Sequence, residues 1–547
     1  MIRRVWIWPF GLVAVAVGVF AGIVAVRGAV PGWAAQPSHG FTQDSPGLHG
    51  LLVALLLLVL GWGLLRARRV ALVATVLLIG WVTLAMRHTG WSILPIGYAL
   101  ALVLCYHGFP AVPDRGQIRA AVRNGALALV VTVLIEWAAR HGWVAHLGLA
   151  ASTLIVLVVL LITTLRAAPA PEPATEAERA RVAALVRRPG ADTLAPFALR
   201  SDKSYLFSAD GSAVLGYRVL LGVAVVGGDP VGDPRGYEDV ITKFIALCRH
   251  NGWRPAVLGA RAELTGLWRT QRLTGLQVGE EVMLDVPAFS LATRRMRNVR
   301  QAVGRTHNAG ITTQVARAGD LAPELLAEMS EVSTRWLGKA RERGFSMVLD
   351  GLFDTRNPDA VFVLAFDPER RVVGFQRYLP AGLGYGPTPA QGAALSLDVM
   401  RRERGRFNGL NERMIVDLVA YAKARGISTV SLNFAAFRAL LDRGAQRGPV
   451  QQLGYRTLHL LDPFIQVESL YLFNAKFRPG YLGRRVAFGS WFALPVVLLA
   501  LLGLEFALPY DLRRSHATQA ETESADADRP RLLAWLSRDE RHATSRR

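Results

Sequence analysis

Six apolar runs in the first third of the chain constrain its fold more than any other feature. They cover approximately residues 6–26, 48–65, 70–86, 91–109, 125–140 and 148–165 of the 547-residue sequence. About 20 helical residues cross the roughly 30 Å hydrocarbon core of a bilayer, so these runs and their flanks have the length of membrane spans. We therefore expect residues 1–166 to form an α-helical polytopic membrane domain of about six spans.

The arginines between these runs predict how the spans are oriented. One side of the predicted membrane holds Arg3, Arg4, Arg66, Arg68, Arg69, Arg115, Arg119, Arg123 and Arg166, whereas the other side holds Arg27, Arg87 and Arg140. Cytoplasmic loops carry the excess of basic residues in membrane proteins. The N-terminus and everything after residue 166 are therefore expected in the cytoplasm of a multi-pass plasma membrane protein.

The rest of the chain reads as a cytosolic α/β region. Residues 167–191 begin with prolines that prevent regular structure and become Glu-rich, which predicts a linker and a connecting helix. Strand-like segments follow at 213–226, 281–286, 361–366 and 372–379, and helical segments at 237–250 and 325–342. The last two strands are joined by Asp367–Arg370, a good hairpin connection. This length suffices for two modest domains, 192–320 and 321–485.

Two segments close the chain. Residues 486–510 are apolar but interrupted by Pro495 and Glu505, which favours a helix packed on the domain or on the membrane surface over a seventh span. Residues 511–547 are charged, rich in Ser, Thr and Ala, and poor in core residues. We expect this tail to be disordered.

Basic residues outnumber acidic ones by 63 to 42, and only five of them are lysines. Arginine suits phosphate geometry, although genome composition explains such a bias equally well. One arginine strip, with Phe289 and Met296 nearby, comprises Arg294, Arg295, Arg297, Arg300 and Arg305. It fits the phosphodiesters of RNA or of anionic lipid, and a solvated helix face is the alternative. The two cysteines, Cys105 and Cys248, form no disulfide framework, which fits a reducing compartment.

Asp398 and Arg401 form the most suggestive polar pair. They lie three residues apart, and on a helix this spacing would put both on one face, where the carboxylate orients the guanidinium toward a phosphate or a polarised carbonyl. A surface ion pair is the alternative.

Two further motifs follow strand-like segments. In Gly227-Gly228-Asp229-Pro230 the glycines allow close backbone approach, although a plain turn explains the motif as well. Only one of Glu280 and Glu281 can point into a site, since neighbouring strand residues face opposite ways; a solvated strand end is the alternative. The sequence has no metal-ligand spacing, no GxSxG elbow and no Walker loop. We therefore assign no metal.

A set of motifs connects the chain to a known family. The motifs are Lys203-Ser-Tyr-Leu-Phe-Ser-Ala-Asp-Gly, Gly216-Tyr-Arg-Val, Gly228-Asp-Pro-Val-Gly, Gly279-Glu-Glu, Gly344-Phe-Ser-Met, Ser396-Leu-Asp-Val-Met-Arg-Arg, Ser431-Leu-Asn-Phe-Ala and Phe473-Asn-Ala-Lys-Phe-Arg-Pro. In this order, over about residues 200–485, the chain resembles bacterial phosphatidylglycerol aminoacyltransferases of the multiple peptide resistance factor type. The likeness is greatest to the membrane-transferase half of fused lysyltransferase/lysyl-tRNA synthetase proteins.

The resemblance implies tandem acyltransferase folds of the acetyltransferase (GNAT) type, joined around a tunnel. It implies that an aminoacyl group, lysyl by likeness, passes from aminoacyl-tRNA to phosphatidylglycerol, which lowers the negative charge of the membrane. It makes Asp398 and Arg401 the catalytic candidates. The substrate-binding candidates are Lys203, Asp229, Glu280, Glu281, Ser346 and Asn433. No cofactor is implied beyond aminoacyl-tRNA as co-substrate.

The chain departs from the family pattern in its length. Longer relatives carry extra spans that flip the product, and fused ones carry a synthetase, so we expect synthesis without flipping and a separate aminoacyl-tRNA synthetase. Neither the amino acid nor the oligomeric state is readable from the sequence. Two rival functions are a membrane-anchored CoA-dependent acetyltransferase and a non-catalytic lipid-binding scaffold. The only soluble match to a CoA loop, Arg335–Ala340, lies in a helical pattern, which disfavours the first rival.

Overall fold

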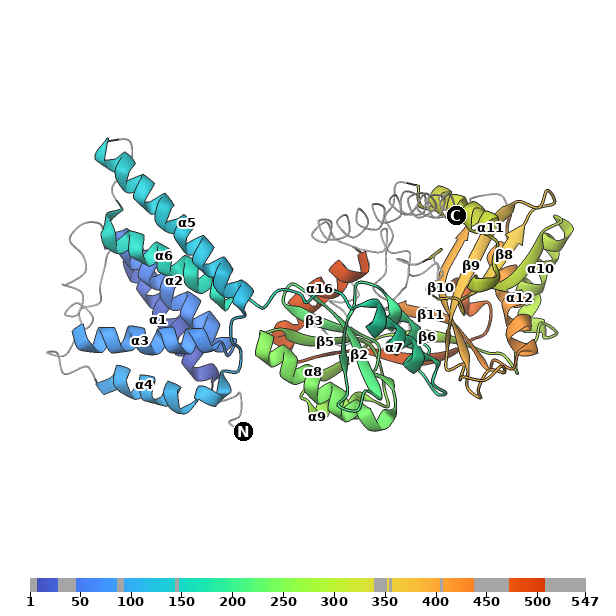
Figure 1. Ribbon diagram of the computed structural model, residues 1–547, viewed down its shortest axis with the longest axis horizontal. Coiled ribbons are helices and arrows are strands. Elements are labelled where there is room, and N and C mark those ends of the chain that lie inside the picture. Colours follow the sequence, from blue (N-terminus) through green and yellow to red (C-terminus); the bar gives the residue numbers. More distant parts are fainter. Residues whose placement is uncertain are drawn as a thin grey trace, which may run out of the picture.

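The computed structural model describes residues 7–27, 46–85, 93–142, 147–338, 352–353, 357–403, 407–436 and 472–506. Figure 1 shows a group of N-terminal helices at one end of the molecule and an α/β part at the other. The candidate Ser346 and the expected disordered tail at 511–547 lie outside the described residues.

Each of the six apolar runs coincides with a helix. The helices are α1 (Trp8–Arg27), α2 (Pro46–Leu65), α3 (Arg69–Ala85), α4 (Ile93–Leu104), α5 (Arg115–Arg140) and α6 (Gly148–Leu165). Within the described residues, three stretches are long and apolar enough to cross a membrane, namely Trp8–Val26, Arg115–Arg140 and Gly148–Leu165. Shorter apolar stretches occur in α2, α3 and α4. The structure thus has N-terminal helices that could span a membrane, and the number of six spans stays a prediction.

The connecting helix expected after the Pro-rich linker is α7 (Glu176–Arg187). Thr175 accepts a hydrogen bond from the backbone N–H of Glu178, whose side chain in turn accepts one from the backbone N–H of Thr175. This capping box satisfies N–H groups that the first turn of a helix otherwise leaves unbonded. After α7 the chain reaches the 3-10 helix η4 (Ala195–Leu199), which contacts both β2 and β9.

Within the described residues, one continuous sheet of twelve strands forms the α/β part. The strands are β1 (Ser204–Phe207), β2 (Ala213–Leu220), β3 (Val223–Gly227), β4 (Val231–Gly232), β5 (Arg254–Arg261), β6 (Thr274–Asp285), β7 (Thr312–Arg317), β8 (Val361–Phe366), β9 (Val372–Ala381), β10 (Ala394–Arg402), β11 (Thr429–Ala436) and β12 (Gly480–Phe488). Their order is β1-β2-β3-β5-β12-β6-β11-β10-β9-β8-β7, with β4 paired to β2. β12 therefore joins two halves of the sheet, and the tandem arrangement of two GNAT-type folds stays a prediction.

Two strand pairs are parallel, β3 with β5 and β10 with β11. Parallel neighbours need a crossover connection, usually a helix. Here the connections contain α8 (Tyr237–Asn251) and α12 (Leu410–Ala424), respectively. The β10–β11 pairing covers only Ala394–Ser396 against Thr429–Ser431, after which β11 continues against β6.

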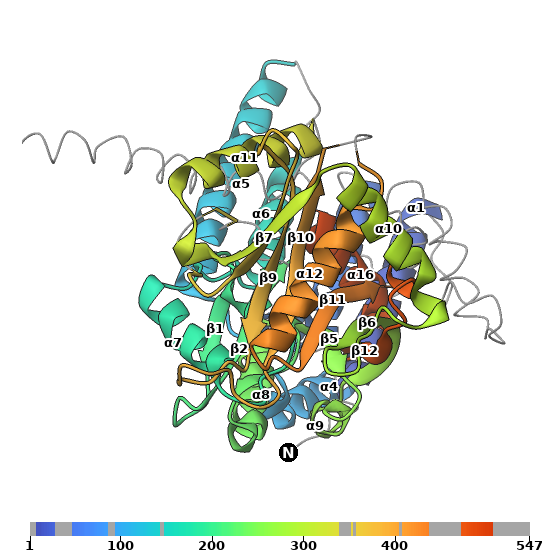
Figure 2. The ribbon, with the colours of Figure 1, turned by 90° about the vertical axis from the view of Figure 1, so that its right-hand side faces the viewer.

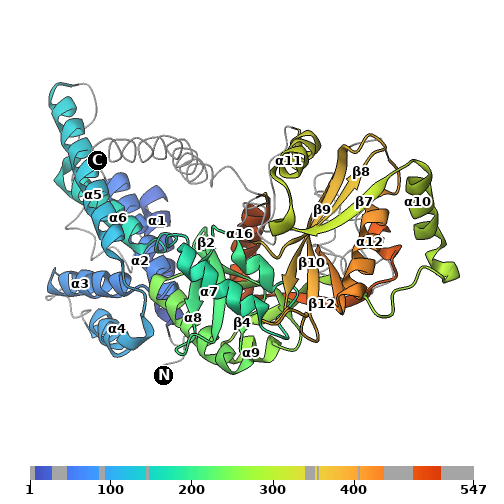
Figure 3. The ribbon, with the colours of Figure 1, turned by 45° about the vertical axis from the view of Figure 1, so that its right-hand side comes forward.

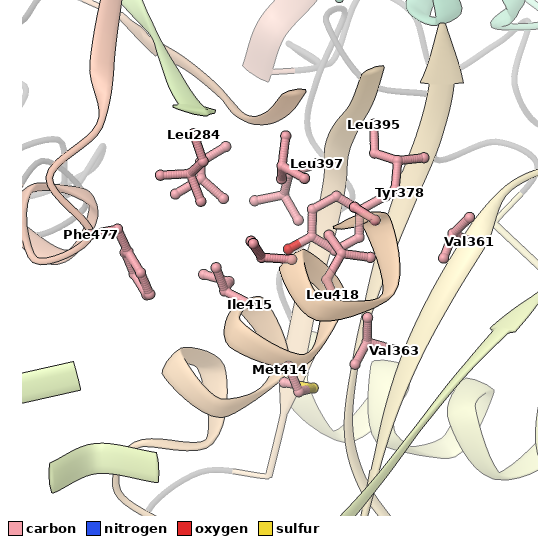
Figure 4. Packing of buried hydrophobic residues seen from close by; sticks show 14 of the residues in the cluster. Leu284, Val361, Val363, Tyr378, Leu395, Leu397, Met414, Ile415, Leu418 and Phe477 are labelled. Carbon is pink, nitrogen blue, oxygen red and sulfur yellow. The ribbon is translucent and has the colours of Figure 1, made fainter. Parts of the chain in front are cut away.

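Helices cover both faces of the second half of the sheet. On β8, Val361 and Val363 pack with Met414 and Leu418 of α12, and Figure 4 shows this core. The alternate residue Phe362 packs on the other face, with Met329 and other residues of α11 (Pro323–Leu337). Figure 2 shows α12 lying against the strands, with α10 (Arg297–Asn308) beside it. The period-two alternation of side chains along β8 separates the two cores.

The first half of the sheet has its own two layers. Buried residues of α8, among them Val240 and Phe244, pack on one face. On the other face, Val497 and Ala500 of α16 (Leu494–Phe506) pack on Val225 of β3. The apolar segment expected at 486–510 thus contains the end of β12 and a helix packed on the sheet.

Two expectations need refinement. The strand-like segment 213–226 is a hairpin, in which Leu221 and Gly222 form the turn with φ values of 51° and 71°. Positive φ at both central residues is the turn that matches the twist of paired strands. In addition, Val282 and Val299, which the sequence grouped with the first domain, share a core with Val361 of the second.

Candidate active site

Asp398 and Arg401 lie on strand β10, so the helical placement considered for their spacing is wrong. In a regular strand, residues three apart point to opposite faces of the sheet. The pairing of β10 with β9 shifts at this point, because Leu397 pairs with Tyr378 and Val399 pairs with Arg377, which leaves Asp398 as an extra residue. Such a bulge reverses the alternation that follows it.

The bulge brings Asp398 and Arg401 to one face of the sheet. Before it, Leu397 points into the core under α12. After it, Val399 and the Arg401 partner Phe375 belong to the face under α11. The guanidinium carbon of Arg401 lies 4.6 Å from the ring centre of Trp336, at the end of α11.

Arg377 of β9 completes this group. Its Nη1 atom lies 3.4 Å from Oδ2 of Asp398. The three side chains are almost fully buried, with exposed fractions of 0% for Asp398, 1% for Arg377 and 2% for Arg401. A solvated surface pair, the alternative considered for Asp398 and Arg401, is therefore excluded.

A second group of buried polar residues, which we call the Arg484 network, crosses the middle of the sheet. It consists of Asp192, Thr193, Asp229, Arg261, Glu281, Ser396, Ser431 and Arg484. Arg484 of β12 donates to both carboxylate oxygens of Asp192, at 3.0 and 2.9 Å, and from Nε to Glu281 of β6 at 3.0 Å. Glu281 in turn accepts a hydrogen bond from Ser431.

The network reaches the strand that carries Asp398. Ser396, two residues before Asp398, donates from Oγ to the carbonyl oxygen of Thr193 at 2.6 Å. The hydroxyl oxygen of Thr193 accepts from Arg484 at 3.2 Å. Ser396 and Ser431 are register partners in the β10–β11 pair. The Asp192–Thr193 segment therefore links β12 to β10 across strands that separate them in the sheet.

Asp229 lies at the end of β3 and faces two arginines. Its Oδ2 atom accepts from the backbone N–H and Nε of Arg261, at 3.0 and 3.2 Å, and lies 3.7 Å from Nη1 of Arg484. Burial, and then the negative charge of Asp192, raise the pKa of Asp229 to about 6. Burial opposes ionisation of Asp192 too, but the charges of Arg484 and Arg261 hold its pKa below the ordinary value.

Asp229→Asn is expected to reduce the pH dependence of stability. The pKa of Asp229 is raised from 3.8 to about 6, so the folded protein binds more protons than the unfolded chain in this range. The stability that this difference in proton binding adds to the folded state is fully present below pH 3.8 and is lost as pH rises through 6. The free energy of unfolding should therefore fall by about 1 kcal/mol between pH 5 and pH 7 in the wild type. Urea unfolding at both pH values measures this.

In Asp229→Asn this part of the decrease should disappear. The exposed Glu263, on the loop after β5, offers a matched control, because Glu263→Gln should leave the pH dependence unchanged. An unchanged slope in Asp229→Asn would show that the carboxyl group is ionised throughout.

Comparison with known proteins places the chain in a family. Residues 183–488, more than half of the chain, match the family model described as phosphatidylglycerol lysyltransferase, C-terminal. The chain belongs to this family. The matched range contains the bulge residues Asp398 and Arg401 and the whole Arg484 network.

Two relatives illustrate the relationship. The chain is 41% identical over 332 residues to the MprF-like domain protein Rv1619 of Mycobacterium tuberculosis, which covers 60% of this chain and 66% of that protein. It is 36% identical over 358 residues to the lysylphosphatidylglycerol biosynthesis bifunctional protein LysX of Gordonia bronchialis, covering 64% of this chain and 31% of that protein. The chain thus spans less than two thirds of these relatives.

Two solved structures share the fold. L-PGS from Bacillus licheniformis superposes with a TM-score of 0.52 at 22% identity, covering 60% of this chain and 96% of that one. A C-terminal domain from Agrobacterium fabrum, named for lysylphosphatidylglycerol synthetase, also has a TM-score of 0.52, at 20% identity, and covers 61% and 98%.

The substrate-binding candidates predicted for this member of the lysyltransferase family do not gather at a single place in the structure. Lys203 is buried, and its Nζ donates to the carbonyl oxygen of Phe197 at 2.8 Å, which ties β1 to η4. Glu280 is half-buried beside the fully buried Glu281. Asn433 lies on β11, and its side chain, like Ser346, is outside the described part of the chain. The structure therefore brings together Asp229 and Glu281 through Arg484, and Asp398 and Arg401 on the bulge.

Sequence reasoning missed Asp192, Arg261, Arg377 and Arg484. Arg377 was detectable in one respect, because it is a charged residue within the strand-like segment 372–379, where charges are rarely buried without a partner. Together the two groups hold four carboxylates, on Asp192, Asp229, Glu281 and Asp398, and four guanidiniums, on Arg261, Arg377, Arg401 and Arg484. Such a site offers carboxylates to a proton or an ammonium group, and guanidiniums to a phosphate or an oxyanion.

Proposed function

We propose that the protein transfers an aminoacyl group from aminoacyl-tRNA to a glycerol hydroxyl of phosphatidylglycerol at the cytoplasmic face of the plasma membrane. The observation that carries the proposal is the buried Asp398–Arg377–Arg401 group on the β10 bulge, within the range matched by the phosphatidylglycerol lysyltransferase model. Lysyl is the proposed acyl group, because LysX is named for lysylphosphatidylglycerol biosynthesis. The product lipid carries less negative charge than the acceptor.

The proposed reaction exchanges one oxygen ester for another. The glycerol hydroxyl oxygen attacks the carbonyl carbon of the aminoacyl ester, and the ribose oxygen of the tRNA leaves and takes up a proton. A hydroxyl is a weak nucleophile until its proton is removed, and the tetrahedral intermediate carries an oxyanion. Asp398 would accept the hydroxyl proton, Arg401 would hold the lipid phosphate or the oxyanion, and Arg377 would position Asp398.

Placement at the membrane is supported by the helices and by their loops. The three stretches long enough to span are all N-terminal to the catalytic part, and Arg66, Arg68 and Arg69 follow α2 on the side predicted to be cytoplasmic. The exposed aromatic rings of Trp491 and Phe492 precede α16. The ring centre of Phe492 lies 6.0 Å from that of Trp8 of α1. Aromatic residues at this level fit the membrane interface.

The arginine strip supports tRNA as the donor. Met296, Val299 and Ala302 are buried, whereas all five arginines of the strip are exposed on the outer side of α10 and its preceding turn. Figures 1 and 3 show α10 at the end of the molecule farthest from the N-terminal helices. A phosphodiester bound there belongs to a soluble polyanion more naturally than to the lipid bilayer.

Membranes that contain this protein are expected to form aminoacyl-phosphatidylglycerol when supplied with charged tRNA and phosphatidylglycerol. Thin-layer chromatography of lipid extracts, with radiolabelled lysine on the tRNA, measures the product and identifies the amino acid. Arg297→Gln combined with Arg305→Gln should raise the tRNA concentration needed for half-maximal rate. The exposed Arg269 of α9 (Thr265–Thr270) provides the control, since Arg269→Gln changes a charge outside the strip.

Ribonuclease treatment before the reaction separates the alternatives. Product that survives destruction of the tRNA would exclude tRNA as the donor. If no acylated lipid forms with any charged tRNA, the enzymatic proposal fails and a lipid-binding scaffold becomes the better account.

A further inference from the structure

The turn between α2 and α3 contacts the α/β part, which contains the proposed catalytic residues, through a buried arginine. Arg68 is 2% exposed, and its two terminal nitrogens donate to the carbonyl oxygens of Asn251 and Gly252, at 3.3 and 3.2 Å. These carbonyls are at the C-terminal end of α8, where the helix dipole favours a cation. A Cβ atom on Gly252 would lie 2.0 Å from the guanidinium carbon of Arg68, so the two parts fit closely here.

Two more arginines flank this contact in the chain, one on each side of the junction. Arg66 belongs to the same turn, and Arg254 begins β5, two residues after Gly252. Among the described residues, none of the three forms a salt bridge, and the buried Nε atom of Arg68 has no hydrogen-bond partner. The last turn of α8 adds Arg249 and His250 to this basic region.

Burial lowers the pKa of all three guanidiniums, and neighbouring positive charge lowers the pKa of Arg66 and Arg68 further. Burial, then the positive charges of Arg254 and Arg68, lower the pKa of Arg66 to about 10. Burial and the charge of Arg254 lower the pKa of Arg68 to about 10 as well, and burial lowers the pKa of Arg254. The dipole of α8 stabilises the positive charge of Arg68, but not the charges of Arg66 and Arg254. An anion between the three side chains would offset their desolvation and their repulsion.

The position of the cluster identifies the anion. Arg66 stacks on Trp62 in the last turn of α2, with its guanidinium carbon 4.3 Å from the ring centre. Tryptophan at the end of an apolar helix marks the level of lipid headgroups, and basic residues at that level attract anionic lipids. A headgroup phosphate is thus the anion present at this place in the fold.

We propose that Arg66, Arg68 and Arg254 form a binding site for the phosphate of an anionic phospholipid, at the junction between the N-terminal helices and the catalytic part. The lipid would hold the two parts together as their common counterion. This site is distinct from the Asp398–Arg377–Arg401 group, and its occupation requires no aminoacyl transfer.

Lipid binding to the full-length protein in detergent tests this proposal. Native mass spectrometry would compare retention of phosphatidylglycerol with that of phosphatidylcholine, without tRNA. Wild type should retain phosphatidylglycerol preferentially. Arg66→Gln combined with Arg254→Gln should lower this preference about 30-fold, because the variant removes two of the three charges proposed to surround one phosphate. Arg68 is left in place because its carbonyl contacts serve docking.

Two control variants test whether the effect is specific to the proposed site. Arg119→Gln combined with Arg123→Gln removes two exposed arginines of α5 on the same predicted side of the membrane, and should leave the preference intact. Arg66→Lys should retain most of it. An unchanged preference in the Arg66/Arg254 double variant, or displacement of the lipid by millimolar inorganic phosphate, would overturn the lipid site. Since no transfer is measured, either result leaves the proposed aminoacyl transfer to be judged separately.

Discussion

Asp398→Asn and Arg401→Ala are each expected to lower turnover in the proposed aminoacyl-phosphatidylglycerol synthesis by on the order of 10²-fold or more. This corresponds to a barrier increase of about 2.7 kcal/mol. The reason is the position of both groups, buried on one face of the β10 bulge, where water does not screen their interaction with a charged transition state. Initial rates of the full-length protein in phosphatidylglycerol liposomes, with saturating charged tRNA, measure the effect.

The double variant should lose far less than the product of the two single effects, because groups that act on one transition state fail together. Asp417→Asn on α12 is a matched control. Asp417 pairs with Arg413 at 2.5 Å, yet this pair is partly exposed and belongs to the helix on the opposite face of the sheet. Its loss should cost about 0–1 kcal/mol of stability and little activity.

Thermal unfolding of each variant distinguishes a catalytic loss from a folding defect, since Asp398 also contacts Arg377 in the buried site. Near-normal turnover in both single variants would reject the catalytic assignment and favour the scaffold function.

Arg484→Gln is expected to lower the free energy of unfolding by about 3–5 kcal/mol, the usual cost of removing one partner from a buried ion pair. Arg484 is fully buried and contacts Asp192, Asp229 and Glu281. Glutamine leaves these carboxylates without their shared cation. Urea unfolding of the full chain in detergent, followed by the fluorescence of buried tryptophans such as Trp268, measures the change.

Arg485→Gln is the control for this second experiment. Arg485 is the next residue on β12, is only partly buried and lies on the other side of the strand. Its loss should change the free energy of unfolding by less than about 0.5 kcal/mol. Arg484→Lys should restore stability only in part, because an ammonium group lacks the fork geometry that reaches two carboxylates. If Arg484→Gln lowers the free energy of unfolding by less than 1 kcal/mol, water or a rearrangement of side chains must replace the lost cation beside these carboxylates.

Local pattern predicted much of the secondary structure. The apolar runs became helices, the periodic segment 237–250 became α8, and the Asp367–Arg370 connection joined β8 to β9. The β2–β3 turn was not predicted, because its first residue is Leu221 and leucine is not one of the residues that mark a turn with positive φ in a sequence. The motif resemblance also predicted the family correctly.

The sequence by itself determined which segments are apolar, which periodicity each segment has, and which family the motifs belong to, because these properties depend on residues near one another in the chain. Only the tertiary structure decided that Asp398 and Arg401 share a face, since that depends on a bulge set by pairing with β9. It also decided that Asp192 meets Arg484 across 292 positions of sequence. No local pattern encodes such a contact, because it exists only when β12 inserts between β5 and β6 and buries both charges together.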